Sequence, residues 1–213
     1  WKSRLSTKII AVNEDMINLY FSKMLDKIVN FPLAIDTKKF TPTLPSDVLM
    51  KELNIFDSDF VIISVANLVP VKGIETLIEA VKKTNDKQIK VLIVGDNTHD
   101  YGEELKTRYQ KDSNIQFIGK QLDVKPYLAL ADLFVIPTKD EGRKEGIPNA
   151  PLEAMAMNCI VLGSNISGIN DILKPFPNSM FKADDINSLA HKIMAIKDMS
   201  ANDSELLGKA MRD

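Results

Sequence analysis

The sequence predicts an α/β fold: a doubly wound, Rossmann-like parallel sheet with helices on both faces. From Asp59 onward, short β-branched apolar runs alternate with longer amphipathic segments. Because the short runs are apolar throughout, we expect strands that are buried on both faces of a parallel sheet. Right-handed crossovers between such strands give the doubly wound arrangement, in which ligands bind at the carboxyl ends of the strands.

Each expected strand is an apolar run, and several of these runs end at a residue that favours a turn. Gly95, Gly119 and Pro137 are such residues. In chain order, the expected strands cover residues 60–66, 89–94, 114–118, 133–136, 159–163 and 179–181.

The expected helices lie between these strands and after the last of them. In the first, Ile74, Leu77 and Ile78 recur at helical spacing and form one apolar face. In chain order, the expected helices cover residues 73–84, 101–110, 124–130, 150–157, 169–173, 186–196 and 201–211.

The N-terminal residues do not follow this alternation. We expect strands at residues 8–12 and 27–29 on either side of a helix at 14–24. Prolines then break up a linker: Pro32, Pro42 and Pro45. We interpret residues 1–45 as the trailing segment of a preceding domain plus its linker, and 46–213 as the sheet domain. An N-terminal extension of the same sheet is the alternative.

Composition narrows the class of protein. A formal net charge of -2 and a pI near 5.8 give no support for charge-driven binding of nucleic acid. No apolar run is long enough to cross a bilayer. The single cysteine, Cys159, excludes an intrachain disulfide, fits a reducing compartment and lies in an apolar stretch that predicts burial. The chain opens on Trp1 and its last expected helix has no terminating signal, so we expect part of a larger protein.

The stretch from residue 139 to residue 156 carries the most chemical information. It places Glu145 in the loop after a strand and Glu153 in the first turns of the next helix. Gly146 lets the backbone pass close to a ligand, and the free N–H groups at a helix start suit an anionic phosphate. The alternative is structural, because acids near a helix start stabilise it by a few tenths of a kcal/mol without any ligand.

Two further features follow other strands. Lys72 stands immediately before Gly73, which opens a helix, so its ammonium group can reach a phosphate at the carboxyl end of the preceding strand. A solvated surface lysine is the alternative. Small residues at 164–171 follow another strand, where backbone amides could meet a phosphate or a sugar.

Together these features resemble the family 4 (group 1) retaining glycosyltransferases of the GT-B fold. The hallmark of that family is a pair of glutamates with seven residues between them, which stands here as Glu145-Gly-Ile-Pro-Asn-Ala-Pro-Leu-Glu153. Further landmarks recur in order at residues 67–73, 94–96, 117–119 and 131–137. Residues 8–14 and 35–40 resemble the end of the acceptor domain and the interdomain linker. The resemblance makes 46–213 the nucleotide-sugar donor-binding domain, one half of a GT-B fold.

The resemblance implies a role for each matching position. Glu145 would face the donor sugar, Glu153 would hold the ribose hydroxyls, and Lys72 would neutralise charge on the departing diphosphate. Other donor contacts would come from the loops at the strand ends, around the phosphates, the sugar and the nucleobase. These implied positions are Asn67, Gly119, Lys120, Gly146, Ile147, Pro148, Asn149, Gly168 and Asp171. No cofactor or metal ion is implied.

The implied activity is transfer of a sugar, with retention of configuration, to a saccharide or lipid-linked acceptor in polysaccharide biosynthesis. The donor would be a nucleoside-diphosphate sugar, UDP- or GDP-linked. The missing N-terminal acceptor domain would complete the cleft, so this chain alone should bind the donor weakly and be inactive. The resemblance implies a cytoplasmic location and leaves open a peripheral contact with the inner face of the membrane through the missing half.

Several positions depart from the family pattern. Asn67 stands where many relatives carry arginine, Asp171 stands where glutamate is common, and residues 31–34 replace the usual Pro-Asn-Gly. His99 and His191 lie on polar surface segments, so neither replaces the histidine that the acceptor domain usually contributes.

Two alternatives remain at the level of sequence: a sugar-nucleotide epimerase of the same architecture, and a non-catalytic nucleotide-binding module. A dehydrogenase is disfavoured because no Gly-x-Gly-x-x-Gly follows any expected strand.

Overall fold

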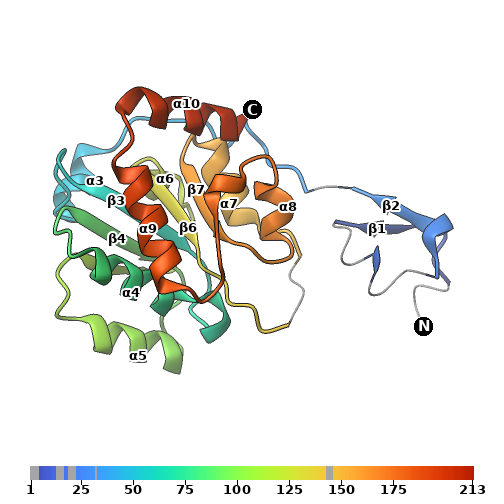
Figure 1. The fold of residues 1–213 in the computed structure, drawn as a ribbon, viewed down its shortest axis with the longest axis horizontal. Coiled ribbons are helices and arrows are strands. Elements are labelled where there is room, and N and C mark those ends of the chain that lie inside the picture. The colour runs from blue at the N-terminus through green and yellow to red at the C-terminus, as the bar shows by residue number, and fades with distance from the viewer. Residues whose placement is uncertain (1–4, 13–16, 19–22, 32, 143–145) are drawn as a thin grey trace.

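The computed structural model describes residues 5–12, 17–18, 23–31, 33–142 and 146–213. Its body is a six-stranded parallel sheet in the order β5-β4-β3-β6-β7-β8 (Figure 1). The strands are β3 (Phe60–Val65), β4 (Ile89–Val94), β5 (Ile115–Gly119), β6 (Leu133–Ile136), β7 (Ile160–Ser164) and β8 (Met180–Phe181). The predicted fold class is confirmed, and each of these strands lies within one residue of its expected bounds.

The helices that connect and follow these strands are also confirmed. They are α4 (Ile74–Thr84), α5 (Asp100–Tyr109), α6 (Lys125–Leu128), α7 (Asn149–Ala156), α8 (Ile169–Leu173), α9 (Ile186–Lys197) and α10 (Ala201–Arg212). The largest difference is α6, which ends two residues earlier than expected, at Leu128. Among the described residues, no helix has the length and hydropathy needed to cross a bilayer.

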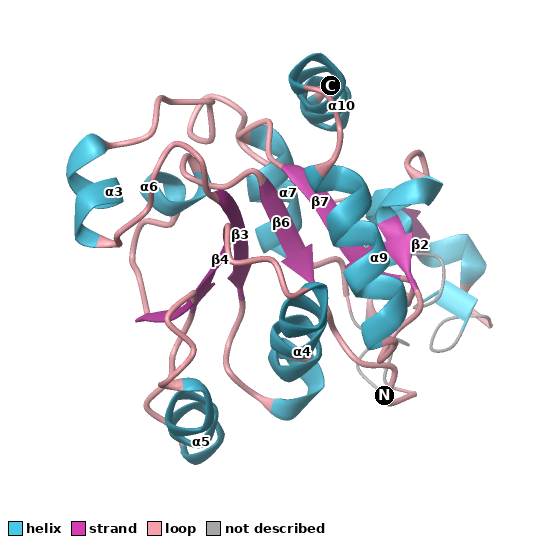
Figure 2. Ribbon diagram, turned by 60° about the vertical axis from the view of Figure 1, so that its left-hand side comes forward, coloured by secondary structure: helices cyan, strands magenta, loops and turns pink. Residues whose placement is uncertain are grey.

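Two layers of helices enclose the sheet and create its core. Figure 2 shows α4 and α9 side by side on one face, and α7 on the other. Strand residues such as Ile63, Leu92 and Phe134 are therefore completely buried, as are Leu77 and Ile78 on the inner face of α4. This burial explains why the strand segments are largely apolar rather than alternating with polar residues.

One helix was not predicted. Helix α3 (Asp47–Glu52) begins at Ser46, whose hydroxyl accepts a hydrogen bond from the Leu49 backbone N–H at 3.4 Å. No residue of α3 is fully buried, although Leu49 and Met50 pack against the core, and the helix has only six residues, so its apolar face is short. Short 3₁₀ turns occur at η1 (Leu25–Lys27), η2 (Pro70–Lys72) and η3 (Pro177–Ser179).

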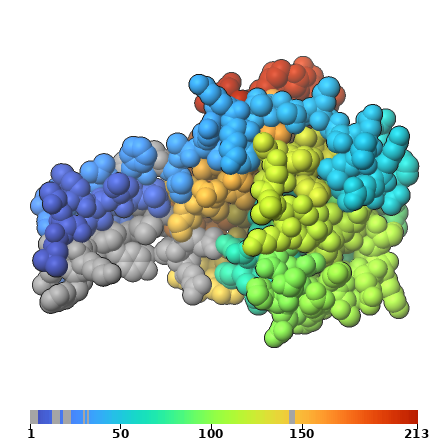
Figure 3. Space-filling view, turned by 180° about the vertical axis from the view of Figure 1, so that it is seen from behind, coloured from blue at the N-terminus to red at the C-terminus, as the bar shows by residue number. Residues whose placement is uncertain are grey.

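The N-terminal strands form a separate two-stranded sheet. β1 (Ile9–Ala11) pairs in parallel with β2 (Ile28–Asn30), and neither joins the six-stranded sheet. This pairing argues against an extension of the main sheet. The strands project from the body (Figure 3), and Ile10 and Phe31 are 70% and 62% exposed.

The helix expected at 14–24 lies largely outside the described residues. Residues 17–18 are helical, whereas Lys23 and Met24 are not. The division of the chain at residue 45 stays a prediction.

The linker joins the sheet domain beside its last helix. Phe40 is buried, and its backbone oxygen accepts a hydrogen bond from Arg212 at 3.2 Å, while the Thr37 oxygen accepts one at 3.3 Å. Helix α10 packs against α7 and β7. Gly208 makes this packing possible, because a Cβ there would lie 2.3 Å from the backbone oxygen of Asn158.

We expect Gly208→Ala to destabilise the domain, although alanine is the better helix former by about 1 kcal/mol. The added Cβ would force α10 away from α7 and β7. The free energy of unfolding should fall by about 1–3 kcal/mol, measured by urea denaturation followed by circular dichroism. Asn202→Ala, at an exposed position of the same helix, is the control and should change it by less than about 0.5 kcal/mol. Equal losses in the two variants would contradict this packing.

Candidate functional site

The candidate site lies at the carboxyl edge of the sheet. Strand β3 pairs with β4 on one side and with β6 on the other, so the strand order reverses between β3 and β6. In an open parallel sheet, the loops that leave such neighbouring strands diverge to opposite faces and create a crevice. The loops after β3 and β6 carry Lys72 and the first predicted glutamate, Glu145.

The loop after β3 rests directly on the loop after β6. Lys72 ends the 3₁₀ turn η2, and Gly73 follows with a φ of 66°. A Cβ on Gly73 would lie 2.0 Å from the Pro137 oxygen, so only glycine fits this approach. The Lys139 N–H also donates a hydrogen bond to the Val71 oxygen at 2.8 Å. The partly buried Lys72 is therefore fixed to the loop that leads toward the glutamate pair.

Glu145 lies outside the described residues, together with Arg143 and Lys144. The loop is described up to Gly142, whose N–H donates to the Asp140 carboxylate at 3.1 Å, and again from Gly146. The predicted approach of Glu145 to Lys72 therefore stays a prediction.

The start of α7 offers unsatisfied backbone donors. Pro148 is its N-cap, and no side chain caps the helix. Among the described residues, the N–H groups of Asn149 and Ala150 therefore have no intrahelical or side-chain partner, as in anion-binding helix starts. Gly146 is exposed, Ile147 and Pro148 are partly buried, and a Cβ on Gly146 would meet no atom within 4 Å. This geometry leaves room for a ligand beside the backbone.

Glu153 lies in the second turn of α7 and is half-buried. Burial raises the pKa of its carboxyl group, and the positive charge of Lys39 partly opposes that rise. None of the described residues donates a hydrogen bond to this carboxylate. A partly desolvated carboxylate without a donor has a strong tendency to accept hydrogen bonds from a ligand.

The ends of β3, β4 and β5 are held together by backbone contacts. A Cβ on Gly95 would lie 1.8 Å from the Ala66 oxygen, and the Gly95 N–H donates to the Gly119 oxygen at 3.0 Å. Asn67 lies two residues after β3, Lys120 directly follows β5, and both are exposed. The structure thus gathers these predicted positions along one edge.

The loop after β7 reaches the same edge. The Ser164 hydroxyl donates to the Thr138 oxygen at 2.7 Å, which joins the ends of β7 and β6. Gly168 has a φ of 84°, and its N–H donates to the Asp171 carboxylate at 3.2 Å. This bond engages one Asp171 oxygen in shaping the loop and leaves the other for a ligand.

Sequence reasoning assigned no role to three residues on or near this edge. The Asp96 carboxylate follows β4, and hydrogen bonds from Thr98 lower its pKa. The Thr138 hydroxyl is fully buried and has no hydrogen-bond partner in the described part of the chain. Lys39, in the linker, lies close enough to Glu153 for its positive charge to lower the pKa of that carboxyl group. Asp96 belongs to the landmark at residues 94–96, although no role was assigned to it, whereas nothing in the sequence pairs Lys39 with Glu153.

Some features lie away from the site. His99 and His191 are exposed, as expected for surface residues. Within the described ranges, no group of three or more His, Cys, Asp or Glu residues could hold a metal ion.

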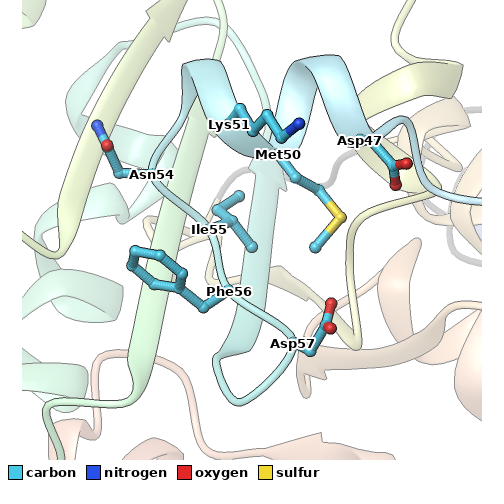
Figure 4. Close-up of a pocket in the computed structure, with 7 residues that line it drawn as sticks. All are labelled: Asp47, Met50, Lys51, Asn54, Ile55, Phe56 and Asp57. Carbon is cyan, nitrogen blue, oxygen red and sulfur yellow. The ribbon is translucent and has the colours of Figure 1, made fainter.

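Figure 4 shows a pocket of about 410 Å³ that contains none of the predicted site residues. It lies between α3 and the segment before β3, at the amino edge of the sheet, and is lined by Asp47, Met50, Lys51, Asn54, Ile55, Phe56 and Asp57.

Comparisons with known proteins point to one family. The model of the family described as glycosyl transferases group 1 matches residues 46–212. An Escherichia coli enzyme named UDP-Gal:alpha-D-GlcNAc-diphosphoundecaprenol alpha-1,3-galactosyltransferase is 29% identical over 211 residues, 92% of this chain and 52% of that enzyme. A Corynebacterium glutamicum enzyme is 28% identical over 180 residues, 79% of this chain and 46% of that enzyme. Its name is GDP-mannose-dependent monoacylated alpha-(1-6)-phosphatidylinositol monomannoside mannosyltransferase.

A structural neighbour agrees on the fold. The crystal structure of Anabaena Alr3699/HepE in complex with UDP and glucose matches with a TM-score of 0.84 and 20% identity, covering 98% of this chain and 58% of that chain. The chain spans about half the length of the curated relatives described above.

We expect Glu153→Gln to stabilise the fold at neutral pH. The raised pKa means that burial disfavours the ionised carboxylate, a cost that is fully present near pH 7 and absent below about pH 4, where the group is protonated in both states. The gain in the free energy of unfolding should be less than about 1 kcal/mol, because the side chain is partly solvated. Thermal denaturation at the two pH values measures it. Glu141→Gln, in the exposed loop between β6 and α7, is the control and should leave the free energy of unfolding nearly unchanged.

Proposed function

Because the chain belongs to the glycosyl transferases group 1 family, we propose that it is the donor-binding half of a retaining glycosyltransferase. The observation that carries the proposal is the contact between the loops after β3 and β6. The bond from the Lys139 N–H to the Val71 oxygen, and the approach of Gly73 to Pro137, fix Lys72 beside the segment that precedes α7. A diphosphate placed at the start of α7 would lie next to this lysine.

In this proposal, the donor spans the carboxyl edge from β5 to β7. The nucleobase contacts the backbone around Gly119 and Lys120, and the ribose hydroxyls donate to Glu153. Glu153 is half-buried, and none of the described residues donates a hydrogen bond to its carboxylate. Both observations support its role as a hydrogen-bond acceptor for the ribose. Asn67 contributes a neutral contact where an arginine would contribute charge.

The phosphates and the donor sugar occupy the middle of the edge. Lys72 and the backbone at 146–149 neutralise the diphosphate, in the role that a metal ion has in other enzymes. Glu145 faces the donor sugar, and the loop with Gly168 and Asp171 borders the sugar and diphosphate. We propose that attack occurs on the face from which the diphosphate leaves, with a phosphate oxygen taking the proton of the acceptor hydroxyl. No cofactor is required for this reaction.

The donor class follows from the relatives. One is named for UDP-galactose and one for GDP-mannose, so we propose a UDP- or GDP-linked sugar. The acceptors in those names are a diphosphoundecaprenol-linked sugar and a phosphatidylinositol mannoside. We therefore propose a saccharide or lipid-linked acceptor for the whole protein, with peripheral contact to the inner face of the membrane through the other half.

The exposure of the N-terminal strands supports the proposal that a second domain packs against them. An isolated two-stranded sheet is marginally stable, and a parallel pair is normally covered on both faces. Ile10, Val29 and Phe31 are all more than 40% exposed. We propose that the missing acceptor domain covers these side chains and completes the cleft, so that this chain alone binds donor nucleotide without transferring sugar.

Nucleotide binding tests the proposal. UDP or GDP should bind the chain at millimolar concentration in isothermal calorimetry, and Glu153→Ala should weaken binding at least about tenfold by removing the ribose acceptor. Glu141→Ala, in the exposed loop after β6, is the control and should bind like the wild type. Absence of binding at millimolar nucleotide, or equal affinity of the Glu153→Ala and wild-type chains, would contradict the site.

A second variant isolates the diphosphate contact. Lys72→Met should weaken UDP binding by about tenfold or more while leaving uridine binding unchanged, because uridine has no phosphate for the ammonium group to neutralise. Fluorescence-competition titrations with both ligands measure the difference. Lys83→Met, on the exposed surface of α4, should affect neither ligand. Equal loss of UDP and uridine binding in Lys72→Met would place the lysine outside the phosphate subsite.

A further inference from the structure

A second recess opens at the carboxyl edge, beside the proposed donor site. Its volume is about 510 Å³, within the range of small-molecule sites, and it lies where the loops after β6, β7 and β8 meet. Asp140 comes from the loop after β6, Asn165 from the loop after β7, and Lys182 and Ser188 from the segment that follows β8. None of the residues assigned above to the donor lines it.

The recess has a fixed floor. The Asn165 N–H donates to the Phe181 oxygen at 2.7 Å, and Phe181 is buried, so the loops after β7 and β8 are joined. The start of α9 is fixed as well, because the Asp185 carboxylate accepts from the Ser188 N–H at 2.9 Å. A preorganised floor lowers the entropy cost of binding a small ligand.

Unused polar groups surround this floor. Within the described residues, the side chains of Asn165, Lys182 and Ser188 make no hydrogen bond or ion pair with protein groups, and the Asp140 carboxylate accepts only from the Gly142 N–H. Together they provide a carboxylate, an amide, an ammonium group and a hydroxyl, which are both donors and acceptors. Such a set can satisfy hydroxyl groups, each of which donates and accepts.

The charge and the apolar surface narrow the ligand class. Asp140 and Lys182 carry opposite charges, so the recess has no net charge to attract a second nucleotide or a free phosphate. Pro177 and Met180 give it an apolar patch. Polar groups at the rim combined with a small apolar floor match a pyranose ring, which has hydroxyls at its edge and C–H groups on its face.

We propose that this recess is a saccharide subsite, which binds one sugar ring of the acceptor next to the sugar being transferred. The assignment of that ring to the acceptor rests on the proposed function, because only a sugar transferase would place donor and acceptor sugars at one edge. The subsite makes the donor-binding half a contributor to acceptor specificity.

Nuclear magnetic resonance of the ¹⁵N-labelled chain tests the subsite. The probes are the methyl glycosides of glucose, galactose and N-acetylglucosamine, each titrated at millimolar concentration with and without saturating UDP. At least one glycoside should shift the backbone amide signals of Asn165, Lys182 and Ser188, and UDP should not prevent these shifts. The double variant Lys182→Ala, Ser188→Ala should bind that glycoside roughly tenfold more weakly, because two hydrogen bonds are lost.

Controls separate the possible failures. The double variant Lys111→Ala, Asn202→Ala alters exposed residues elsewhere and should bind glycosides normally. Shifts confined to residues that UDP also shifts, shifts caused by inorganic phosphate instead of glycosides, or no shifts with any glycoside would each overturn the subsite. If UDP shifts amide signals and no glycoside does, only this inference is refuted. If a glycoside shifts amide signals and UDP does not, the proposed donor site is refuted.

Discussion

The close backbone contact between the loops after β3 and β6 is the constraint on which the site depends. Gly73 lies against the Pro137 oxygen without a side chain between them, and one hydrogen bond, from the Lys139 N–H to the Val71 oxygen, fixes the two loops together. A larger residue at position 73 would separate these loops at the point where the strand order reverses. The position of Lys72 relative to the end of β6 is therefore set by main-chain packing and not by flexible side chains.

Much of the fold could be predicted because the forces that shape it are local or periodic. Ile74, Leu77 and Ile78 repeat at helical spacing, and all three are completely buried in α4. The all-apolar strands required burial on both faces, and the sheet provides it. Helix α3 was missed because it is only six residues long and fully buries none of them, so its apolar periodicity is too short to stand out beside the Ser46 cap.

The candidate site could be predicted only in outline. Lys72, Glu153 and Gly168 follow strand ends or helix starts, so topology alone brings them to one edge. The sequence does not reveal how desolvated Glu153 is, or that Lys39 approaches it from the linker, because both depend on packing between segments far apart in the chain. The buried Thr138 hydroxyl is hidden for the same reason. Glu145 lies outside the described residues, so its role stays a prediction.

The bonds from Arg212 to the backbone oxygens of Thr37 and Phe40 have a consequence for how this domain relates to a longer polypeptide. They bring the point where the chain enters the sheet domain next to the end of its last helix. Arg212 and Phe40, which one of these bonds joins, are 172 positions apart in the chain. The orientation of the linker on the sheet domain therefore depends on α10 as well as on the linker residues themselves.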